Sequence, residues 1–181
     1  MRYISILRGI NVGGNRKILM KDLKSFYEKL GFSNVETYIQ SGNVIFELDQ
    51  KLSNVDLEER IQKGIAETFG FDVPIIVRTA DDWSESIANN PFWKEKDADI
   101  EKLHLTMLKE EPSYELVKKI KELRFLPDRF EILGKDVFVS CENGYGRSKI
   151  TNEFFEKRLK IPATTRNWKT VIKLHEMINS Q

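Results

Sequence analysis

The feature that most constrains the fold is a pattern that occurs twice along the chain. Residues 73–87 read VPIIVRTADDWSESI and residues 161–174 read IPATTRNWKTVIKL, so an apolar residue, a proline, a threonine and a tryptophan follow in the same order. In this alignment Trp83 and Trp168 occupy matching places. A repeat of this kind indicates that one structural unit is used twice. We therefore interpret the chain as two copies of one unit.

The first copy begins with strand-like and hairpin-like segments. YISIL, residues 3–7, alternates in polarity and is rich in strand formers. VETYIQSGNVIFEL, residues 35–48, predicts a hairpin that turns at Ser41-Gly42-Asn43. Between and after these segments, apolar residues recur at helical spacing, and each of the two helices that they predict ends at a glycine. A third helix is expected to open with a capping box formed by Asp82 and Glu85.

The second copy repeats this order from Leu103 onward. LHLTMLK predicts a strand, SYELVKKIKEL a helix, and FEILGKDVFVSC a hairpin around Gly134-Lys135. The segment TTRNW is expected to open the last helix, with a threonine as its cap and with Arg166 and Asn167 in its first turn. The first copy has two aspartates there, so the exchange of acids for Arg and Asn favours a bound ligand or an acidic partner.

The order of elements predicts an α+β protein. It is the order of the split βαβ, or ferredoxin-like, arrangement, and we expect two tandem βαββαβ-type repeats with antiparallel sheets and with helices packed on one face. Residues 1–92 form the first repeat, residues 93–102 a linker, and residues 103–181 the second repeat. The acidic run WKEKDADIEK marks the linker between the halves.

Composition excludes several classes of protein. A hydrophobic content of 40% and a charged content of 31% are typical of a soluble globular chain, and no apolar run approaches the ~20 residues of a membrane span. Cys141 is the single cysteine, so an internal disulfide is impossible and a reducing cytoplasm is expected. The two histidines lie far from it and from each other in sequence. We therefore expect no metal site, no cofactor and no membrane partner.

The net charge of +1 hides an uneven distribution along the chain. Residues 1–29 hold seven Lys and Arg against two Asp and Glu (+5), and residues 142–181 hold eight against four (+4). The middle, residues 30–141, holds fourteen against twenty-two (−8). If the fold brings both ends together, they make one positive face; otherwise the charges lie scattered on solvated helix faces.

A glycine-rich basic loop, LRGINVGGNRK, follows the first predicted strand. From strand start to hairpin glycine the first copy is eight residues longer than the second (39 − 31), and this loop supplies much of the excess. Gly9 and Gly14 have P-loop spacing, but Asn15 and Arg16 stand where the lysine and the hydroxyl are required, and the dinucleotide pattern also fails. Glycine amides and cations still favour an anion. The alternative is a tight turn with solvated arginines. The candidate ligands are Arg8, Asn11, Gly13, Gly14, Asn15 and Arg16.

Three other segments add candidates. Ser41 and Asn43 lie at the first hairpin tip, which is expected near one end of the first strand; the alternative is an ordinary turn sequence. Arg147 lies in ENGYGRSK, a second basic glycine-rich stretch, before a helix that Ser148 or Thr151 caps. TTRNW contributes two more candidates. These are Arg166 and Asn167.

Several functions remain open at this point. A binding module for a phosphate-containing small molecule or a nucleic-acid backbone is favoured by the basic loops. An enzyme that acts on an anionic substrate would need a general base, and no carboxylate pair or cysteine–histidine pair supplies one. An assembly protein would use the basic face against an acidic partner. An RNA-recognition module is excluded because Asn43 and Ile45 stand where stacking rings are required.

Three segments together resemble a known bacterial family. LRGINVGGNRKILMKDL, GFSNVETYIQSGNVIF and TTRNWKTVIKL are similar, in this order, to the motifs of the domain-of-unknown-function family 1697. The resemblance implies a cytoplasmic α+β protein with a duplicated ferredoxin-like core. It implies no catalytic residue, because the family carries no established activity. The family's motif positions fall here on Arg8, Gly9, Asn11, Gly13, Gly14, Ser41, Gly42, Asn43, Thr165, Arg166, Asn167 and Trp168.

Overall fold

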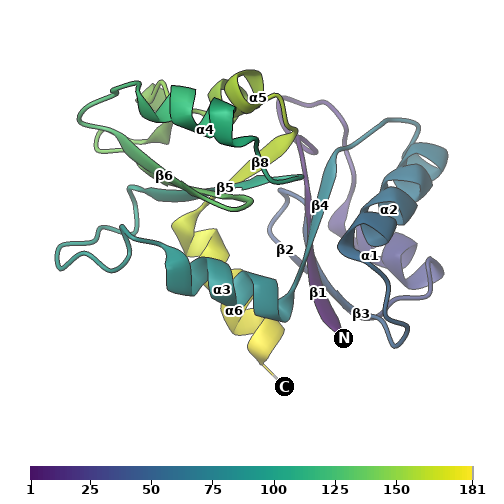
Figure 1. The fold of residues 1–181 in the computed structure, drawn as a ribbon. Coiled ribbons are helices and arrows are strands. Elements are labelled where there is room, and N and C mark those ends of the chain that lie inside the picture. The colour runs from purple at the N-terminus through teal and green to yellow at the C-terminus, as the bar shows by residue number, and fades with distance from the viewer. Residues whose placement is uncertain (181) are drawn as a thin grey trace. The chain divides into compact units, whose positions relative to one another are not determined.

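The structure is a computed structural model that describes residues 1–180, and the chain in it forms two compact units. The first unit consists of residues 1–84 together with the segment from Leu174 onward, and the second consists of residues 85–173. Six α-helices and two four-stranded antiparallel sheets make up these units (Figure 1). The α+β class predicted from the sequence is therefore confirmed.

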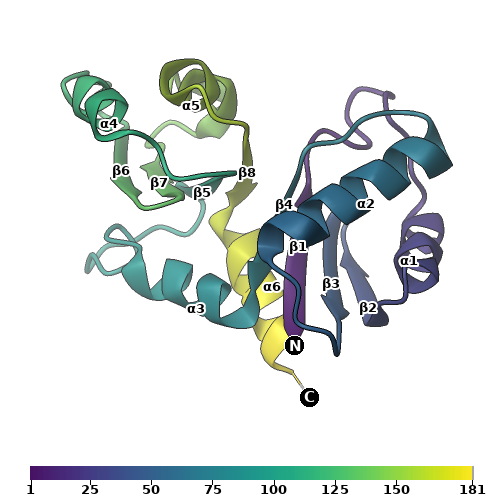
Figure 2. The same ribbon diagram turned by 45° about the vertical axis from the view of Figure 1, so that its right-hand side comes forward.

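The first sheet has the strand order β2-β3-β1-β4, with every neighbouring pair antiparallel. Its strands are β1 (Arg2–Leu7), β2 (Ser33–Tyr38), β3 (Asn43–Glu47) and β4 (Ile75–Thr79). Helices α1 (Met20–Lys29) and α2 (Asn54–Phe69) cover one face of this sheet, as Figures 1 and 2 show. Their apolar sides meet those of the strands in a buried core, because every second residue of a strand points to the same face.

The second sheet has the strand order β6-β7-β5-β8 and is also antiparallel throughout. Its strands are β5 (Leu103–Leu108), β6 (Arg129–Leu133), β7 (Asp136–Ser140) and β8 (Ala163–Asn167). Helices α4 (Tyr114–Lys121) and α5 (Asn152–Leu159) lie on one face of it (Figure 2). A 3₁₀ turn, η1 (Tyr145–Arg147), precedes α5.

Helices lie on both faces of this second sheet, which corrects the expectation of helices on one face. Val139 belongs to the core under α4 and α5, whereas its neighbour Phe138 contacts the ring of Trp168 on α6 (Trp168–Asn179). On the Phe138 side, Ser86 of α3 (Ala80–Asn89) also donates a hydrogen bond to Asp136. Because helices cover both faces of the sheet, β5 is buried along its whole length.

The last helix begins later than the sequence indicated. Thr164 to Asn167 belong to β8, where Arg166 pairs with Leu105, and α6 starts at Trp168. Asn167 caps this helix, since its Oδ1 accepts a hydrogen bond from the Thr170 amide at 2.8 Å. Arg166 therefore does not lie in a helical first turn. The prediction of an acid-to-base exchange at that turn was wrong.

The strand registers also change which residues correspond in the two sheets. Arg78 pairs with Ile4 on β1, as Arg166 pairs with Leu105 on β5. Trp83 is consequently the fourth residue of α3, whereas Trp168 is the first residue of α6. Both tryptophans are fully buried, but they do not occupy matching places.

Helix α3 opens with a capping box one turn earlier than predicted. The amide of Asp82 donates to Thr79 Oγ1, and the amide of Thr79 donates to Asp82 Oδ2, both at 3.0 Å. Burial acts to raise the pKa of Asp82, but hydrogen bonds to its carboxylate, chiefly from the Thr79 amide and from Asn54, lower the pKa overall. Thr79 and Asp82, rather than Asp82 and Glu85, form the box. At α5 the predicted cap is confirmed, because Thr151 accepts from the Phe154 amide.

The predicted linker, residues 93–102, is attached to the second unit by side chains. Glu95 accepts two hydrogen bonds from Arg129, at 2.8 and 2.9 Å. Glu101 forms an ion pair with Lys169, and the ring of Trp93 lies 6.2 Å from that of Trp168. These contacts place the acidic run inside a folded unit. The division by contacts falls within α3 and α6, whereas the predicted repeats keep each helix whole.

The first unit contains both ends of the described chain. Arg2 donates hydrogen bonds to the main-chain oxygens of Ile178 and Ser180 on and after α6. The side chains of Leu174 and Ile178 are buried. The end of α6 is thus part of the structure that surrounds β1.

Candidate functional site

The glycine loop makes the connection from β1 to α1 longer than the corresponding connection from β5 to α4. Residues 8–19 connect β1 to α1, which is twelve residues, whereas residues 109–113 connect β5 to α4, which is five. Five residues between Gly9 and Arg16 have positive φ angles. Glycine adopts such angles at little cost, but asparagine and arginine do so only where the surroundings hold them. The five are Gly9, Asn11, Gly13, Gly14 and Arg16.

Asn11 holds this loop closed with its side-chain amide. Its Oδ1 accepts a hydrogen bond from the Ile18 amide, and its Nδ2 donates to the Ile18 oxygen, each at 2.9 Å. The same Nδ2 donates to the main-chain oxygen of Gln40 at 2.9 Å. Both polar atoms of the Asn11 side chain are therefore engaged within the protein. The residue acts as a clamp for the loop, which leaves the task of contacting a ligand to its neighbours.

The tip of the loop is a tight turn through Gly13 and Gly14. The Asn15 amide donates to the Val12 oxygen at 3.1 Å, and the two glycines between them have φ angles of 58° and 80°. Two consecutive positive angles are those of a type I′ turn, which explains the glycine pair. Within residues 1–180, no hydrogen bond engages the Gly13 or Gly14 amide. Both glycines are exposed, so the amides are open to solvent or to an anion.

The hairpin tip after β2 lies at the end of β1, as the sequence predicted, and it also contacts this loop. The Leu7 amide donates to the Gly42 oxygen at 2.8 Å, in addition to the bond from Asn11 to Gln40. A Cβ at Gly42 would lie 2.7 Å from Leu7 Cβ and 2.9 Å from Ile10 Cδ1, so only glycine fits. Asn43 is buried and donates to Ser41 Oγ and to the Tyr38 oxygen. The tip therefore supports the loop, with Asn43 inside it.

Two cations of the loop face solvent. Arg16 and Lys17 are exposed, and within the described residues neither has a carboxylate within 4.0 Å. The Arg16 guanidinium lies 3.6 Å from the place where a Gly9 Cβ would be, so it folds back over the loop. Arg8, at the start of the loop, is half-buried, and its amide donates to the Pro74 oxygen at 3.0 Å. Within residues 1–180, the charges of Arg16 and Lys17 are therefore not neutralised by nearby acids.

A small cavity borders the same loop. Its volume is about 240 Å³, and its lining combines polar atoms of Asn11, Lys17 and Gln40 with apolar side chains from the start of α1. Leu19, which lines it, remains 61% exposed. The apolar lining residues are Ile18, Leu19 and Met20.

The candidates of the second unit do not form one cluster. Arg147 is exposed on η1, whose Tyr145 packs beside the core under α4 and α5. Arg166 starts from the opposite face of β8, because it alternates with Thr165, which contacts Asn152 of α5. Its Nη1 donates to Thr164 Oγ1 and to the Thr165 oxygen, and burial lowers its pKa to about 10. Arg166 therefore remains charged at neutral pH.

Two other titratable groups of the second unit are buried. The ring of His104 stacks on Tyr145 at a centroid distance of 4.5 Å, and burial lowers the pKa of the imidazole. Cys141 is buried, and burial raises the pKa of its thiol, which opposes a nucleophilic role. Within residues 1–180, no group of three His, Cys, Asp or Glu side chains is placed to hold a metal ion. In the same part of the chain, no helix is long and apolar enough to cross a membrane.

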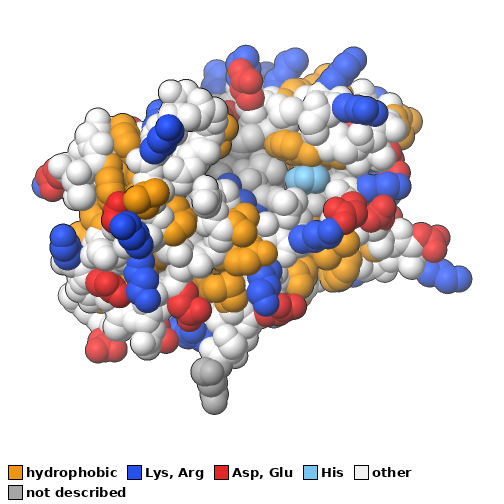
Figure 3. Space-filling view, turned by 180° about the vertical axis from the view of Figure 1, so that it is seen from behind, with side chains coloured by type: hydrophobic (Ala, Val, Ile, Leu, Met, Phe, Trp, Pro, Cys, Tyr) orange, Lys and Arg blue, Asp and Glu red, His pale blue; other side chains and the backbone are white. Residues whose placement is uncertain are grey.

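On the face of the molecule that Figure 3 shows, basic and acidic side chains are interspersed. Apolar side chains reach the surface between them. The uneven distribution of charge along the sequence therefore does not produce a region of one sign over this face. On this face, an anion would be attracted by a local group of cations rather than by a broad basic surface.

Comparison with known proteins identifies the family. A family described as a protein of unknown function, DUF1697, matches residues 1–138. The chain belongs to this family. The match includes the glycine loop and the hairpin tip, while TTRNW lies beyond it. No curated protein matches the chain.

A solved structure shares the fold. The conserved bacterial protein SP0830 from Streptococcus pneumoniae is 25% identical and superposes with a TM-score of 0.79 over 98% of each chain.

Proposed function

We propose that this chain is a binding module for a small phosphate-bearing molecule, held by the loop of residues 8–18 in the first unit. The observation that carries the proposal is the pairing of open Gly13 and Gly14 amides with Arg16 and Lys17, which have no carboxylate neighbour within residues 1–180. Main-chain amides in positive-φ segments attract anions, and adjacent cations strengthen that attraction. The clamp by Asn11 fixes the arrangement before a ligand arrives, which reduces the entropic cost of binding.

The neighbouring cavity favours a small molecule over a nucleic-acid backbone. A volume of about 240 Å³ with the apolar side chains of Ile18, Leu19 and Met20 suits the organic part of a phosphate ester. A phosphate group would lie on the Gly13–Gly14 turn, and its substituent would enter this cavity. We also propose a cytoplasmic setting, because Cys141 is a free thiol.

We further propose that the fold consists of two ferredoxin-like repeats. The antiparallel orders β2-β3-β1-β4 and β6-β7-β5-β8, each with one helix after its first strand and one after its third, support this interpretation. The equivalent registers of Arg78 and Arg166 support an internal duplication. On this interpretation the glycine loop is an insertion in the first repeat, as expected for a functional segment.

Inorganic phosphate, titrated against the ¹⁵N-labelled protein, tests the proposed site. We expect the amide resonances of Gly13, Gly14, Arg16 and Lys17 to move at millimolar phosphate, and the apparent affinity to fall as potassium chloride is added. Arg16→Ala should weaken binding by about threefold or more. Lys63→Ala is the matched control, because Lys63 is an exposed cation on α2. Resonances of the loop that stay in place at millimolar phosphate would contradict the proposal.

A further inference from the structure

The second sheet has an open edge. Strand β6 stands at one end of the order β6-β7-β5-β8, so β7 is its neighbour on one side and no strand of the described residues lies on the other. Its register with β7 runs from Arg129 to Leu133 without a bulge. A regular edge strand of this kind is a template for a further strand.

The alternation of hydrogen bonds shows which main-chain groups point outward. β6 and β7 are joined by the two-residue turn Gly134-Lys135, and the pair that closes such a turn, Leu133 with Asp136, is hydrogen-bonded. Hydrogen-bonded pairs alternate along the strand, so Glu131 and Arg129 are the next residues whose main-chain groups bond to β7. The main-chain groups of Phe130 and Ile132, which lie between them, therefore point away from β7. Within residues 1–180, no further hydrogen bond engages them.

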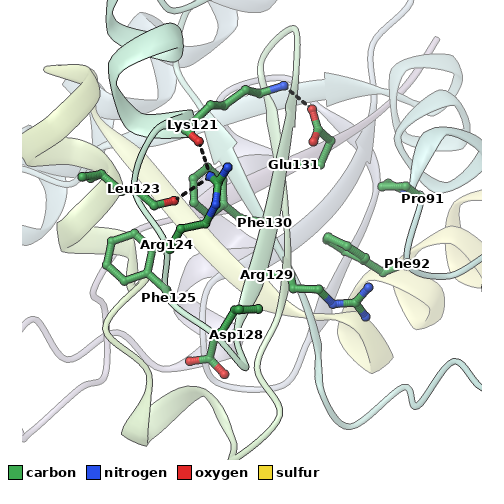
Figure 4. Close-up of a pocket in the computed structure, with 11 residues that line it drawn as sticks. Pro91, Phe92, Lys121, Leu123, Arg124, Phe125, Asp128, Arg129, Phe130 and Glu131 are labelled. Carbon is green, nitrogen blue, oxygen red and sulfur yellow. Dashed lines mark hydrogen bonds and ion pairs between the residues drawn. The ribbon is translucent and has the colours of Figure 1, made fainter.

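A groove with a volume of about 400 Å³ follows this edge (Figure 4). The connection from α4 to β6 forms one wall with Leu123, Arg124 and Phe125, and Pro91 and Phe92 form the other. Leu126 on the first wall is 78% exposed, so its apolar surface is available to a ligand. The groove therefore has apolar side chains on both walls, charged side chains between them, and residues of β6 in its lining.

Both walls are held in place by contacts of the second unit. Arg129 lies 4.8 Å over the ring of Phe92 and binds Glu95 with both of its terminal nitrogens. Phe125 packs edge to face on Phe154 at 5.0 Å on the other wall. At the hairpin end, Lys121 forms an ion pair with Glu131. This pair is partly exposed, so an incoming chain can displace it at small cost.

One charge in the groove lacks an acidic partner. Arg124 donates to the main-chain oxygens of Lys121 and Leu123, and no carboxylate of residues 1–180 lies within 4.0 Å of it. Asp128 also lines the groove, but its oxygens accept from the Glu142 amide and from Ser148 Oγ. Arg124 is therefore the guanidinium of the groove without an ion-pair partner among residues 1–180, and an acidic side chain of a ligand can pair with it.

The corresponding edge of the first sheet is blocked in a way that β6 is not. Strand β2 shifts register between Ser33 and Glu36, and Asn34 within it has a φ angle of 48°. Such a bulge is a common protection of an edge against pairing. β6 lacks this protection.

We propose that the β6 edge binds an extended peptide segment of a partner protein as an additional strand. The segment carries an apolar residue that enters the groove beside Phe125 and Leu126, and an acidic residue two positions away that contacts Arg124. Alternate residues of a strand point to the same side, so these two side chains reach the same wall. Main-chain bonds to Phe130 and Ile132 supply affinity, and the two side chains supply specificity.

A labelled peptide of this chemistry tests the proposal by fluorescence anisotropy. The probe is the acetylated hexapeptide Thr-Leu-Thr-Glu-Thr-Tyr, with the fluorophore at its carboxyl end. We expect saturable binding and movement of the Phe130 and Ile132 amide resonances. Two further peptides each carry one N-methyl group, at neighbouring residues. Methylation of the amide that faces β6 should weaken binding by about tenfold or more, and methylation of its neighbour should not.

Exposed side chains provide the variants, which should leave the fold intact. Arg124→Ala should weaken binding by about threefold, and Arg124→Glu should restore it for a peptide with Lys in place of Glu. Lys118→Ala on α4 is the matched control, and Lys121→Ala should bind at least as tightly as the natural chain.

Three results would overturn the proposal. One is equal effects of the two methylations, since an added strand uses alternate amides. Another is an unchanged affinity after both Arg124 substitutions. The third is a dimer in sedimentation analysis that excludes the peptide, because β6 would then pair with a second copy of this chain.

Discussion

Gly42 shows how closely a single residue joins the hairpin tip to the loop. Its φ angle of 78° already favours glycine, and the space for a side chain is occupied by Leu7 and Ile10. Gly70 has almost the same φ, 79°, but nothing lies within 4 Å of its missing Cβ. The two positions therefore separate the cost of backbone strain from the cost of a steric clash.

We expect Gly42→Ala to lower the free energy of unfolding by about 2–4 kcal/mol, because strain and overpacking add. Gly70→Ala should cost about 1–2 kcal/mol, from strain alone. Urea unfolding followed by circular dichroism measures both. Equal losses of stability for the two variants would show that the hairpin tip shifts to accommodate the added methyl group, which would contradict the tight packing of Gly42 against Leu7 and Ile10.

His104 links stability to pH. Its folded-state pKa lies below the ordinary value of 6.5, so between these two values the unfolded chain binds the extra proton. The contribution of the neutral ring is complete above pH 6.5 and is lost as the pH falls toward the lowered folded value. We expect the free energy of unfolding to fall over this window, and His104→Phe to reduce the slope. An unchanged slope in the variant, measured by urea unfolding at a series of pH values, would contradict this.

Among the elements, the glycine loop depends on one side chain. Asn11 makes three hydrogen bonds to the main chain, which join the two ends of the loop at Ile18 and connect the loop to the hairpin tip at Gln40. Without them, the positive φ angles of the loop lose their support.

Asn11→Ala should destabilise the loop by about 1–3 kcal/mol, because three hydrogen bonds to main-chain groups of Ile18 and Gln40 are lost. Hydrogen exchange should accelerate at residues 10–18 and remain unchanged in β3. Asn15→Ala is the control, since the Asn15 contact described is made by its main chain. Uniform acceleration across the first sheet would show that the clamp stabilises the whole unit instead.

Most elements were predictable from the sequence, because strands with two-residue alternation and helices ended by glycine have strong local signals. The start of α6 was not. Threonine and asparagine are common at helix caps, which is why residues 164–167 were expected to open the helix. These residues instead pair with β5 and form a strand, so the tertiary pairing outweighs the local preference.

The candidate site was predictable only in part. The contact between loop and hairpin tip follows from adjacent strands, as Asn11 and Gln40 show. The roles of Asn11 and Asn43 as internal supports depend on distances that a sequence does not contain. The β6 groove was missed because two segments that are separated in the chain form it, residues 91–92 and residues 121–131, and neither has a distinctive pattern.

At the scale of the whole molecule, the first unit is discontinuous in sequence. Leu174 and Ile178 are buried in it, and Arg2 binds the main chain at the end of α6. The first unit therefore needs both segments, residues 1–84 and the end of α6, for its packing.

A chain that stops at Lys173 should therefore lose stability in the first unit. Each deleted buried side chain contributes about 2–5 kcal/mol, so exchange of the β1 amides should accelerate strongly. Ile178→Ala should give a smaller loss in the same direction, and Asn179→Ala, which changes an exposed side chain, should not. Unaltered β1 exchange in the shortened chain would contradict the assignment of this helix end to the first unit.

The shared helix end also orders events during synthesis. Leu174 follows Ser84 by 90 residues, so the ribosome makes the entire second unit before it releases the segment that completes the first. Strand β1 cannot pack against the end of α6 until residues 174–180 have been made. The segment of the first unit that precedes the second unit therefore completes its packing only after the second unit has been synthesised.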